Sequence, residues 1–316
     1  MKRIISLIYK SALNALPKAA RTSWWLLKII LPVSLAVSIL QYIGVIDIAA
    51  VYLTPLFSLI GLPGESAIVF ITSIFLSLYA PIAIIATLNL EMREITILAL
   101  MCLITHNMIV ETAIQKKTGS SYLRMFLLRL TSSFVAAAAL NWLLPSDLGG
   151  SLVQETVEVQ TSFGNMLLNW LWSAGGLSLK IVLIISGLMI LQNILRDFKL
   201  LHYLSRTFAP LMRFFGLPEK SSFLWFVAQT LGLAYGAAVM IEEVENKEVS
   251  REEANLLNHH IAVNHSMLED TLLFVAIGVP ALWIMTPRVV LALVIVWTVR
   301  IAQKIKKKTN QQKLYT

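Results

Sequence analysis

Long apolar runs alternate with short polar connections along the whole chain. Several runs approach or exceed the roughly 20 residues that an α-helix needs to cross a bilayer. The clearest are Ile29–Ile46, Ala67–Leu88, Ile95–Val110, Ile181–Leu195 and Val279–Val299, the last interrupted by Arg288. Because these runs occur from one end to the other, the pattern predicts an all-α membrane protein rather than a soluble domain with an anchor.

A short motif with two prolines and a glycine occurs twice. Leu53-Thr54-Pro55-Leu56 is followed after four residues by Gly61-Leu62-Pro63. The second copy lies 155 residues later and consists of Phe208-Ala209-Pro210-Leu211 followed by Gly216-Leu217-Pro218. A repeat of this kind fixes the architecture before any single residue does, so we expect two related halves.

The halves divide in the same way, each into five expected membrane segments. In the first half these are Ser23–Gly44, Ile48–Ile60, Ser66–Leu88, Ile95–Gln115 and Tyr122–Leu144. In the second half they are Asn165–Leu195, Leu200–Phe215, Ser221–Met240, Ala254–Ile277 and Val279–Gln303. The second segment of each half is short and is expected to be re-entrant or tilted. An odd number of segments per half predicts two inverted repeats in a polytopic bundle of about 8–10 membrane segments.

Charge changes this picture only by giving it an orientation. Of the 316 residues 57% are apolar and 14% are charged, and the net charge is +8. The basic residues gather at the two termini and in short loops, which is typical of membrane orientation and not of a nucleic-acid interface. We therefore expect five parts: a cytoplasmic amphipathic segment 1–21, a first repeat 22–145, an external acidic linker 146–162, a second repeat 163–303 and a basic cytoplasmic tail 304–316.

Loop charges favour the inverted arrangement. With the N-terminus inside, it places Lys116 and Lys117 inside and the linker, with Glu155 and Glu158, outside. If the short segments only lay on the membrane surface, the linker would be inside and the two lysines outside, against the positive-inside rule. The arginines of the second short segment, Arg206 and Arg213, are left unexplained by this arrangement.

Polar residues concentrate on the fourth segment of each half. An ionisable group inside a bilayer costs about 3 kcal/mol on insertion scales, so such residues face a protein-lined or water-lined surface and usually mark a permeation or proton path. The candidates for solute binding or proton coupling are His106, Asn107, Glu111, Asn264, His265, Glu269 and Asp270. His106 and Glu111 have counterparts in His265 and Asp270 at an offset of 159.

A plainer interpretation of these residues stays open. Glu111 is five residues from Lys116 and is within reach of the cytoplasmic interface by snorkelling.

A metal site is disfavoured, because each shared histidine and acid are five residues apart, roughly 140° around a regular helix. The two groups then converge on one ion only if the helix is broken between them. We expect no bound metal and no cofactor.

Glycine and proline mark the expected turns and helix breaks. They are Pro55, Gly61, Pro63, Pro81, Pro210, Gly216, Pro218 and Gly236. Glycine permits a left-handed backbone and proline suits the first turn of a helix, so the Gly-Leu-Pro motifs predict turns. Pro81 and Gly236 are equivalent positions of the third segments, and indicate either a kinked helix lining a cavity or close helix packing.

The layout resembles the Gate-domain membrane proteins, also called nucleoside-recognition domain proteins. The resemblance covers residues 22–303 and rests on the proline-containing short segment, the Gly-Leu-Pro turn and the polar helix of each half. It implies a multi-pass protein whose gate elements line a transport route. The single Cys102 offers no cysteine-containing gate motif of the ferrous iron transporter kind.

We therefore expect a secondary transporter, or its membrane subunit, that moves a small polar solute or ion across the cytoplasmic membrane, with both termini cytoplasmic. Gly-x-Ser-x-Gly, Walker-type and His-Glu-x-x-His motifs do not occur, which argues against an enzyme. The alternatives are a non-transporting scaffold or partner subunit and, further off, an embedded lipid-modifying enzyme. The expected partners are the lipid bilayer, the solute, and a second copy or partner protein, but no nucleic acid.

Overall fold

The computed structural model describes residues 2–149, 162–198 and 200–313, and this part of the chain is helical. The first half contains α1 (Lys2–Tyr42), α2 (Val45–Ser58), α3 (Ser66–Phe75), α4 (Tyr79–Ile85), α5 (Met92–Thr105), α6 (Met108–Lys117) and α7 (Tyr122–Leu143). The second contains α8 (Phe163–Asp197), α9 (Leu200–Phe214), η1 (Glu219–Ser221), α10 (Ser222–Glu245), α11 (Arg251–Ile261), α12 (Glu269–Val275) and α13 (Ala281–Lys313). The linker carboxylates Glu155 and Glu158 lie outside the described residues.

Long apolar helices confirm a polytopic membrane bundle. Among the described residues, α1, the α5–α6 unit, α7, α8 and α13 are long and apolar enough to cross a bilayer. Large apolar side chains on these helices face outward; Trp142 and Trp172, for example, are 85% and 82% exposed. Such surfaces are stable against lipid and not against water. Helix α5 has the opposite character: most of its side chains are buried, because the other helices surround it.

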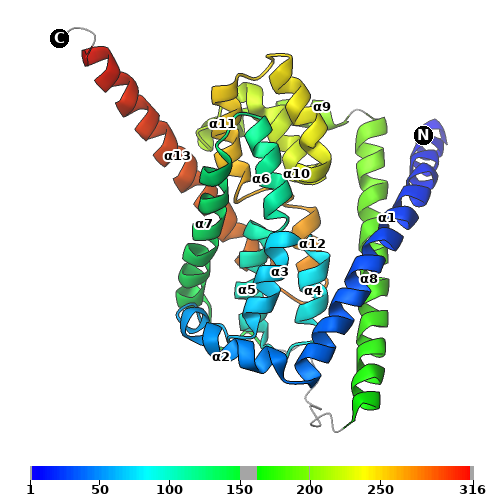
Figure 1. Cartoon of the computed structure of the whole chain (residues 1–316). Helices are drawn as coiled ribbons and strands as arrows, with labels where there is room; N and C mark the ends of the chain where they lie inside the picture. The colour runs from blue at the N-terminus through cyan, green and yellow to red at the C-terminus, as the bar shows by residue number, and fades with distance from the viewer. Residues whose placement is uncertain (1, 150–161, 199, 314–316) are drawn as a thin grey trace.

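The two halves run in opposite directions, which confirms the inverted repeat. In Figure 1 the N-terminal end of α1 and the C-terminal end of α13 lie at the top, whereas α7 ends and α8 begins at the bottom. Helix α2 lies across the lower end and its counterpart α9 lies at the upper end. The elements that traverse the molecule are α1, α5–α6 and α7 in one half and α8, α11–α12 and α13 in the other.

The third segment of the first half is a hairpin, not the single crossing that we expected. Helix α3 ends against the α5–α6 connection, where the Ser73 and Leu76 carbonyls accept from the Asn107 N–H. Tyr79, at the start of α4, contacts Glu269 in the centre. From there α4 runs back toward the end where α5 begins.

The second half repeats this hairpin within α10. Its first arm follows α11, since Trp225 donates to His260 and Gln229 donates to the Asn264 carbonyl. At Gly232 the backbone leaves the helical region, with φ 73° and ψ 173°. The second arm returns to the short connection before Arg251, at the end from which α10 started. Gly232 is the counterpart of Ser77 at the offset of 155, so the turns match.

The hairpins change the number of membrane crossings per half from which we predicted the inverted repeat. We expected the short second segments to enter the membrane, but α2 and α9 lie at opposite ends of the bundle and the third segments are the re-entrant elements (Figure 1). Three traversing elements still leave an odd number per half, so the inverted orientation survives. Helix α9, which carries Arg206 and Arg213, then lies at the same end as both termini, so these two arginines no longer conflict with the positive-inside rule.

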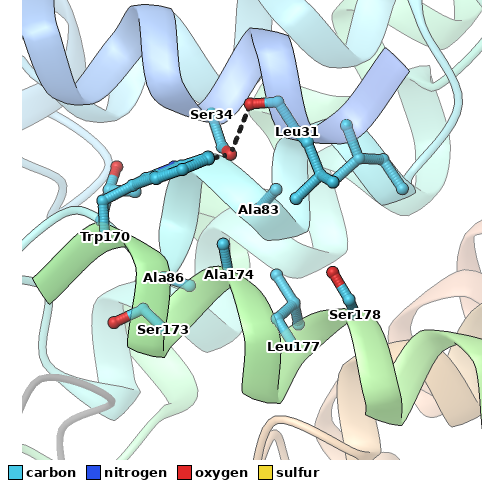
Figure 2. A pocket seen from close by; sticks show the side chains of 11 residues that line it. Leu31, Ser34, Ala83, Ala86, Trp170, Ser173, Ala174, Leu177 and Ser178 are labelled. Atoms are coloured by element: carbon cyan, nitrogen blue, oxygen red, sulfur yellow. Dashed lines mark hydrogen bonds between the residues drawn. The ribbon is translucent and has the colours of Figure 1, made fainter. Parts of the chain in front are cut away.

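Helix α1 pairs with α8 over most of its length. It continues without interruption from Lys2 to Tyr42, so no break marks the expected boundary at residue 21. Near its N-terminal end, Ser11 donates to Asp197 at 2.8 Å and accepts a bond from Asn193 at its carbonyl. Farther along, Trp170 donates to Ser34 at 3.1 Å beside a narrow hollow between α1, α4 and α8 (Figure 2).

The Gly-Leu-Pro motifs form turns in both halves. Gly61 and Gly216 each have a φ of +73°, a left-handed backbone that glycine adopts without strain. Pro63 lies two residues after Gly61 and before helix α3, and Pro218 lies two residues after Gly216 and before the short helix η1.

Most of the other positions at which we expected helix breaks lie within continuous helices. Helices α2 and α9 continue through Pro55 and Pro210. Pro81 lies in the first turn of α4, where a proline fits. In α10 the break is at Gly232, and the helix continues through Gly236. The packing alternative for Gly236 is supported, because a Cβ there would lie 3.0 Å from Val227.

Candidate functional site

The fourth segments are broken helices, and our expectation of regular helices there was wrong. Helix α5 ends at Thr105 and α6 begins at Met108; α11 ends at Ile261 and α12 begins at Glu269. Asn107 and Ser266, at equivalent positions, have φ values of 51° and 48°. This left-handed backbone is uncommon for residues with a side chain and is found where the surroundings hold it.

The hairpin tips hold both breaks in place. The Asn107 N–H donates to the Ser73 carbonyl at 2.9 Å, and the Ser266 N–H donates to the Ala228 carbonyl at 2.9 Å. Ser73 and Ala228 are themselves equivalent at the offset of 155. Each hairpin thereby supplies an acceptor to an N–H that has no partner within its own helix, which is how irregular backbone persists at membrane depth.

The breaks bring His106 and His265 face to face. Their ring centroids are 5.0 Å apart, with the planes inclined by 36°. Each ring binds a carbonyl four residues earlier through Nδ1: His106 binds Cys102 at 3.2 Å and His265 binds Ile261 at 2.7 Å. A carbonyl only accepts, so Nδ1 carries the proton in both rings and Nε2 points into the centre.

Two buried carboxylates face these rings. His106 Nε2 lies 3.5 Å from Glu111 Oε1 and 3.3 Å from Asp270 Oδ2. His265 Nε2 lies 3.2 Å from Glu111 Oε2, so a histidine of the second half contacts the acid of the first. Asp270 and Glu111 are 7% and 2% exposed. The helix breaks allow this convergence, which a regular helix would prevent.

A buried arginine completes the set in each half, and the sequence interpretation missed both. Arg129 donates from Nε to the Ile104 carbonyl at 2.8 Å and from Nη2 to the His106 carbonyl at 2.7 Å. It also pairs with Glu111 at 2.9 Å. Arg288 is the only charge in its apolar run, and Arg129 lies 159 residues before it; this shared offset was the available signal.

A cavity of about 350 Å³ opens beside these groups. Its walls come from α1, α8, the two hairpin tips and the two helix breaks, and Asn107, Glu111 and Asp270 lie on it. Glu269 also lines it, where Oε1 accepts from the Tyr79 hydroxyl at 3.3 Å and Oε2 from the Gln192 amide at 3.4 Å. The wall formed by α1 and α8 is mostly apolar, so a solute would contact polar groups at the centre and apolar side chains on this wall.

Comparison with known proteins adds a family. The Gate family model, described as nucleoside recognition, matches residues 23–120. The uncharacterized membrane protein YvoD of Bacillus subtilis (strain 168) is 34% identical over 302 residues, which cover 94% of this chain and 96% of the relative. The chain belongs to this family of Gate-domain membrane proteins. No solved structure matches it.

The Gate match covers only the first half of this Gate-domain protein's centre. It includes the hairpin α3–α4 and the break that carries His106, Asn107 and Glu111. The second half supplies the equivalent histidine and acid, because His265 faces His106 and Asp270 lies beside the His106 ring. The alignment with the relative extends over both halves.

One candidate lies apart from the others in this Gate-domain protein. Asn264 is buried but does not line the cavity; its carbonyl accepts from Gln229 at 2.6 Å and its amide lies 3.2 Å from His260 Nε2. It joins the first arm of α10 to the end of α11. His265 and Glu269 are four residues apart in the sequence, but the chain breaks between them and His265 faces Glu111 instead.

Proposed function

We propose that this Gate-domain protein is a secondary transporter, or the membrane subunit of one, that moves a small polar solute or ion through the central cavity. The observation that carries the proposal is the facing pair of equivalent His–acid–Arg sets, one from each inverted half, buried beside a cavity. Inverted repeats with substrate sites at broken helices near the midplane are typical of secondary transporters. Residues 22–145 and 163–303 are the two repeats in this proposal.

The broken helices supply the ligands for the solute. At each break the helix is interrupted, and the polar side chains of Asn107, Glu111, Glu269 and Asp270 line the cavity beside it. Buried carboxylates beside histidines are also suited to carry a coupling proton, because a proton held there neutralises charge that is costly within the bilayer. His106 and His265 each contact a carboxylate at 3.2–3.5 Å, close enough to share such a proton.

The hairpins provide the moving parts. Each tip is joined to a break through the backbone bonds of Asn107 and Ser266. A shift of one hairpin therefore changes the position of the facing histidine and acid. Because the halves are inverted copies, the same rearrangement in either half would open the cavity toward opposite sides, which is the usual basis of alternating access.

The test is uptake into proteoliposomes that contain the purified full chain. A panel of small polar solutes and ions is offered under an imposed proton or sodium gradient, with internal pH followed by a trapped dye. We expect flux that Glu111→Gln and Asp270→Asn each reduce at least tenfold. The control is Glu245→Gln, which changes an exposed carboxylate at the end of α10. Size-exclusion profiles and thermal unfolding check that the variants are folded.

The contrary outcome is equally clear. If no solute in the panel moves and the two central variants match wild type in every readout, the transport proposal fails. A partner that co-purifies with the chain, and whose removal destabilises it, would then favour the scaffold alternative.

A further inference from the structure

The centre collects more hydrogen-bond acceptors than the neighbouring donors satisfy. Because Nδ1 of His106 and of His265 donates to a backbone carbonyl, each Nε2 of a neutral ring carries a lone pair. These two nitrogens face Glu111 and Asp270 oxygens at 3.2–3.5 Å. Acceptors placed this close repel one another unless a proton or a metal cation lies between them.

The arginines satisfy only part of this set. Arg129 pairs with Glu111 at 2.9 Å. Arg288 is directed elsewhere: it donates to the Val263 and His265 carbonyls, and no ion pair joins it to Asp270 among the described residues. His265 Nε2 and Asp270 Oδ2 are both buried without a hydrogen-bond partner in this part of the chain. An unpartnered buried polar atom is costly, so these two atoms point to a ligand.

We propose that His106 Nε2, His265 Nε2 and an Asp270 carboxylate oxygen bind a divalent transition-metal cation that enters from the central cavity. As far as the cation is cargo, this inference rests on the proposed transport function. The three ligand atoms lie within 4.8 Å of one another. Ligands of a tetrahedral zinc site with bonds of about 2.0–2.1 Å lie roughly 3.3 Å apart, and His106 Nε2 and Asp270 Oδ2 are already at 3.3 Å.

The ligand chemistry selects the class of cation. Two imidazoles and one carboxylate suit zinc, ferrous iron, manganese or cobalt, whereas calcium and magnesium prefer oxygen alone. Three protein ligands leave a coordination position open toward the cavity, as in sites that exchange their ligand. Cys102 does not line this cavity, so thiolate ligation plays no part. The five-residue spacing between histidine and acid disfavours a shared metal ion only in a regular helix, and both helices are broken between these residues.

The hydrogen bonds from Nδ1 to backbone carbonyls are typical of metal-binding histidines. A metal-binding histidine normally donates its other ring nitrogen to a carbonyl or carboxylate, which fixes the tautomer and the ring orientation. His106 and His265 both show this arrangement, with Cys102 and Ile261 as acceptors. Glu111, held by Arg129, then lies beside the metal as a neighbouring charge rather than as a fourth ligand.

The experiment measures metal binding by the purified full chain in detergent, after treatment with a chelator. Zn²⁺ binding is measured by calorimetry, and Co²⁺ is added as a spectroscopic probe whose visible bands report nitrogen and oxygen ligands in a four-coordinate site. We expect one bound ion per chain and a Zn²⁺ affinity at least tenfold lower in His106→Gln, His265→Gln and Asp270→Asn. Loss of the Co²⁺ bands should accompany each loss of affinity.

His259→Gln is the matched control. His259 is buried in the same α11 helix and also binds a carbonyl through Nδ1, that of Asn255 at 2.7 Å, but it lies outside the cluster. The His259→Gln variant should bind Zn²⁺ and Co²⁺ as wild type does. Thermal unfolding with and without Zn²⁺ gives a second readout, because a ligand that binds only the folded state raises the unfolding temperature.

Two results would overturn the inference. One is the absence of stoichiometric Zn²⁺ or Co²⁺ binding by folded wild-type protein, which would leave shared protons as the occupants of the centre. The other is equal binding by wild type and all three ligand variants. If metal binding fails while uptake of another solute depends on Asp270, the transport proposal stands alone. If the metal binds but nothing is transported, the site stands without the transport proposal.

Discussion

Arg129 and Arg288 make the same backbone contacts in opposite halves of the molecule. Each guanidinium binds the carbonyls that lie 25 and 23 residues before it: Ile104 and His106 for Arg129, and Val263 and His265 for Arg288. These carbonyls lie where α5 and α11 end, and the last carbonyls of a helix have no partner within it. The buried guanidinium therefore donates to carbonyls that have no helical partner at each break, and its positive charge offsets the negative end of the helix dipole.

We expect Arg129→Gln to destabilise the protein strongly. Removing one member of a buried ion pair typically costs about 3–5 kcal/mol, because the other charge stays buried without compensation. Here Glu111 would lose its 2.9 Å partner and two carbonyls would lose a donor. Thermal unfolding in detergent measures the effect.

A double variant separates the two causes. Glu111→Gln combined with Arg129→Gln removes the uncompensated charge but not the loss at the carbonyls, so we expect partial recovery of the unfolding temperature. Arg213→Gln is the control, since Arg213 is 78% exposed and its pairing with Glu219 is near the surface. An unfolding temperature for Arg129→Gln equal to that of the control would contradict the role assigned to Arg129.

The turn glycines should not tolerate a side chain. Gly61 has a φ of +73°, and a Cβ there would overlap the amide oxygen of Asn141. Gly61→Ala therefore combines backbone strain of about 1–2 kcal/mol with a steric clash. We expect a lower unfolding temperature and a lower yield of folded protein.

Gly187→Ala serves as the opposite control. Gly187 lies within α8, and a Cβ there would meet nothing within 4 Å. Alanine in a helix interior is favoured over glycine by roughly 0.5–1 kcal/mol, so this variant should be as stable as wild type or more stable. Equal stability of Gly61→Ala and Gly187→Ala would show that the Gly-Leu-Pro turn does not require its left-handed residue.

Gly232 should control transport more than stability. Its φ of 73° and ψ of 173° lie in a region that is essentially restricted to glycine, but a Cβ would have room, with Ser266 Oγ at 3.6 Å. Gly232→Ala should therefore displace the hairpin tip that holds Ser266, and lower flux in the proteoliposome assay. Ala238→Gly, at an exposed position of the second arm, tests whether any change in α10 has this effect. A Gly232→Ala variant with wild-type flux would sink the assignment of this hairpin as a moving part.

How far the sequence predicts this structure can be judged at particular residues. The repeated motifs predicted the two halves, the loop charges predicted their orientation, and six of the seven polar candidates line the cavity; Asn264 is the exception. The hairpins were not predicted, since an apolar run long enough to cross a bilayer looks the same when it turns back. Ser77 and Gly232 mark equivalent turns with different residues, so no shared motif revealed them. Arg129 was missed because it lies in an apolar run where its partners come from another helix.

The two halves are also joined away from the cavity, through Asn258. Its amide donates to the Gln115 carbonyl at 3.1 Å and to the hydroxyls of Thr118 and Ser120 at 2.9 Å each. Asn258 is fully buried, so Asn258→Leu would leave several polar atoms unpaired. We expect a loss of about 2 kcal/mol or more, by the usual cost of an unsatisfied buried group. The exposed Asn246→Leu should change the unfolding temperature little, and similar values for both variants would contradict the prediction.

The orientation in the membrane can be tested with single cysteines. Cys102 is the only cysteine in the chain and is buried, so Cys102→Ala gives a background for labelling. We expect Asp147→Cys, after the end of α7, to react with a membrane-impermeant maleimide on intact cells. Lys117→Cys, the last residue of α6, and Gln303→Cys, in the C-terminal part of α13, belong to helices that end at the opposite end of the molecule. They should react only after permeabilisation, because loops rich in lysine and arginine stay in the cytoplasm. Labelling of Asp147→Cys and Lys117→Cys from the same side would contradict the traverse of α7. Labelling of Lys117→Cys alone on intact cells would instead reverse the orientation and leave the inverted repeat unchanged.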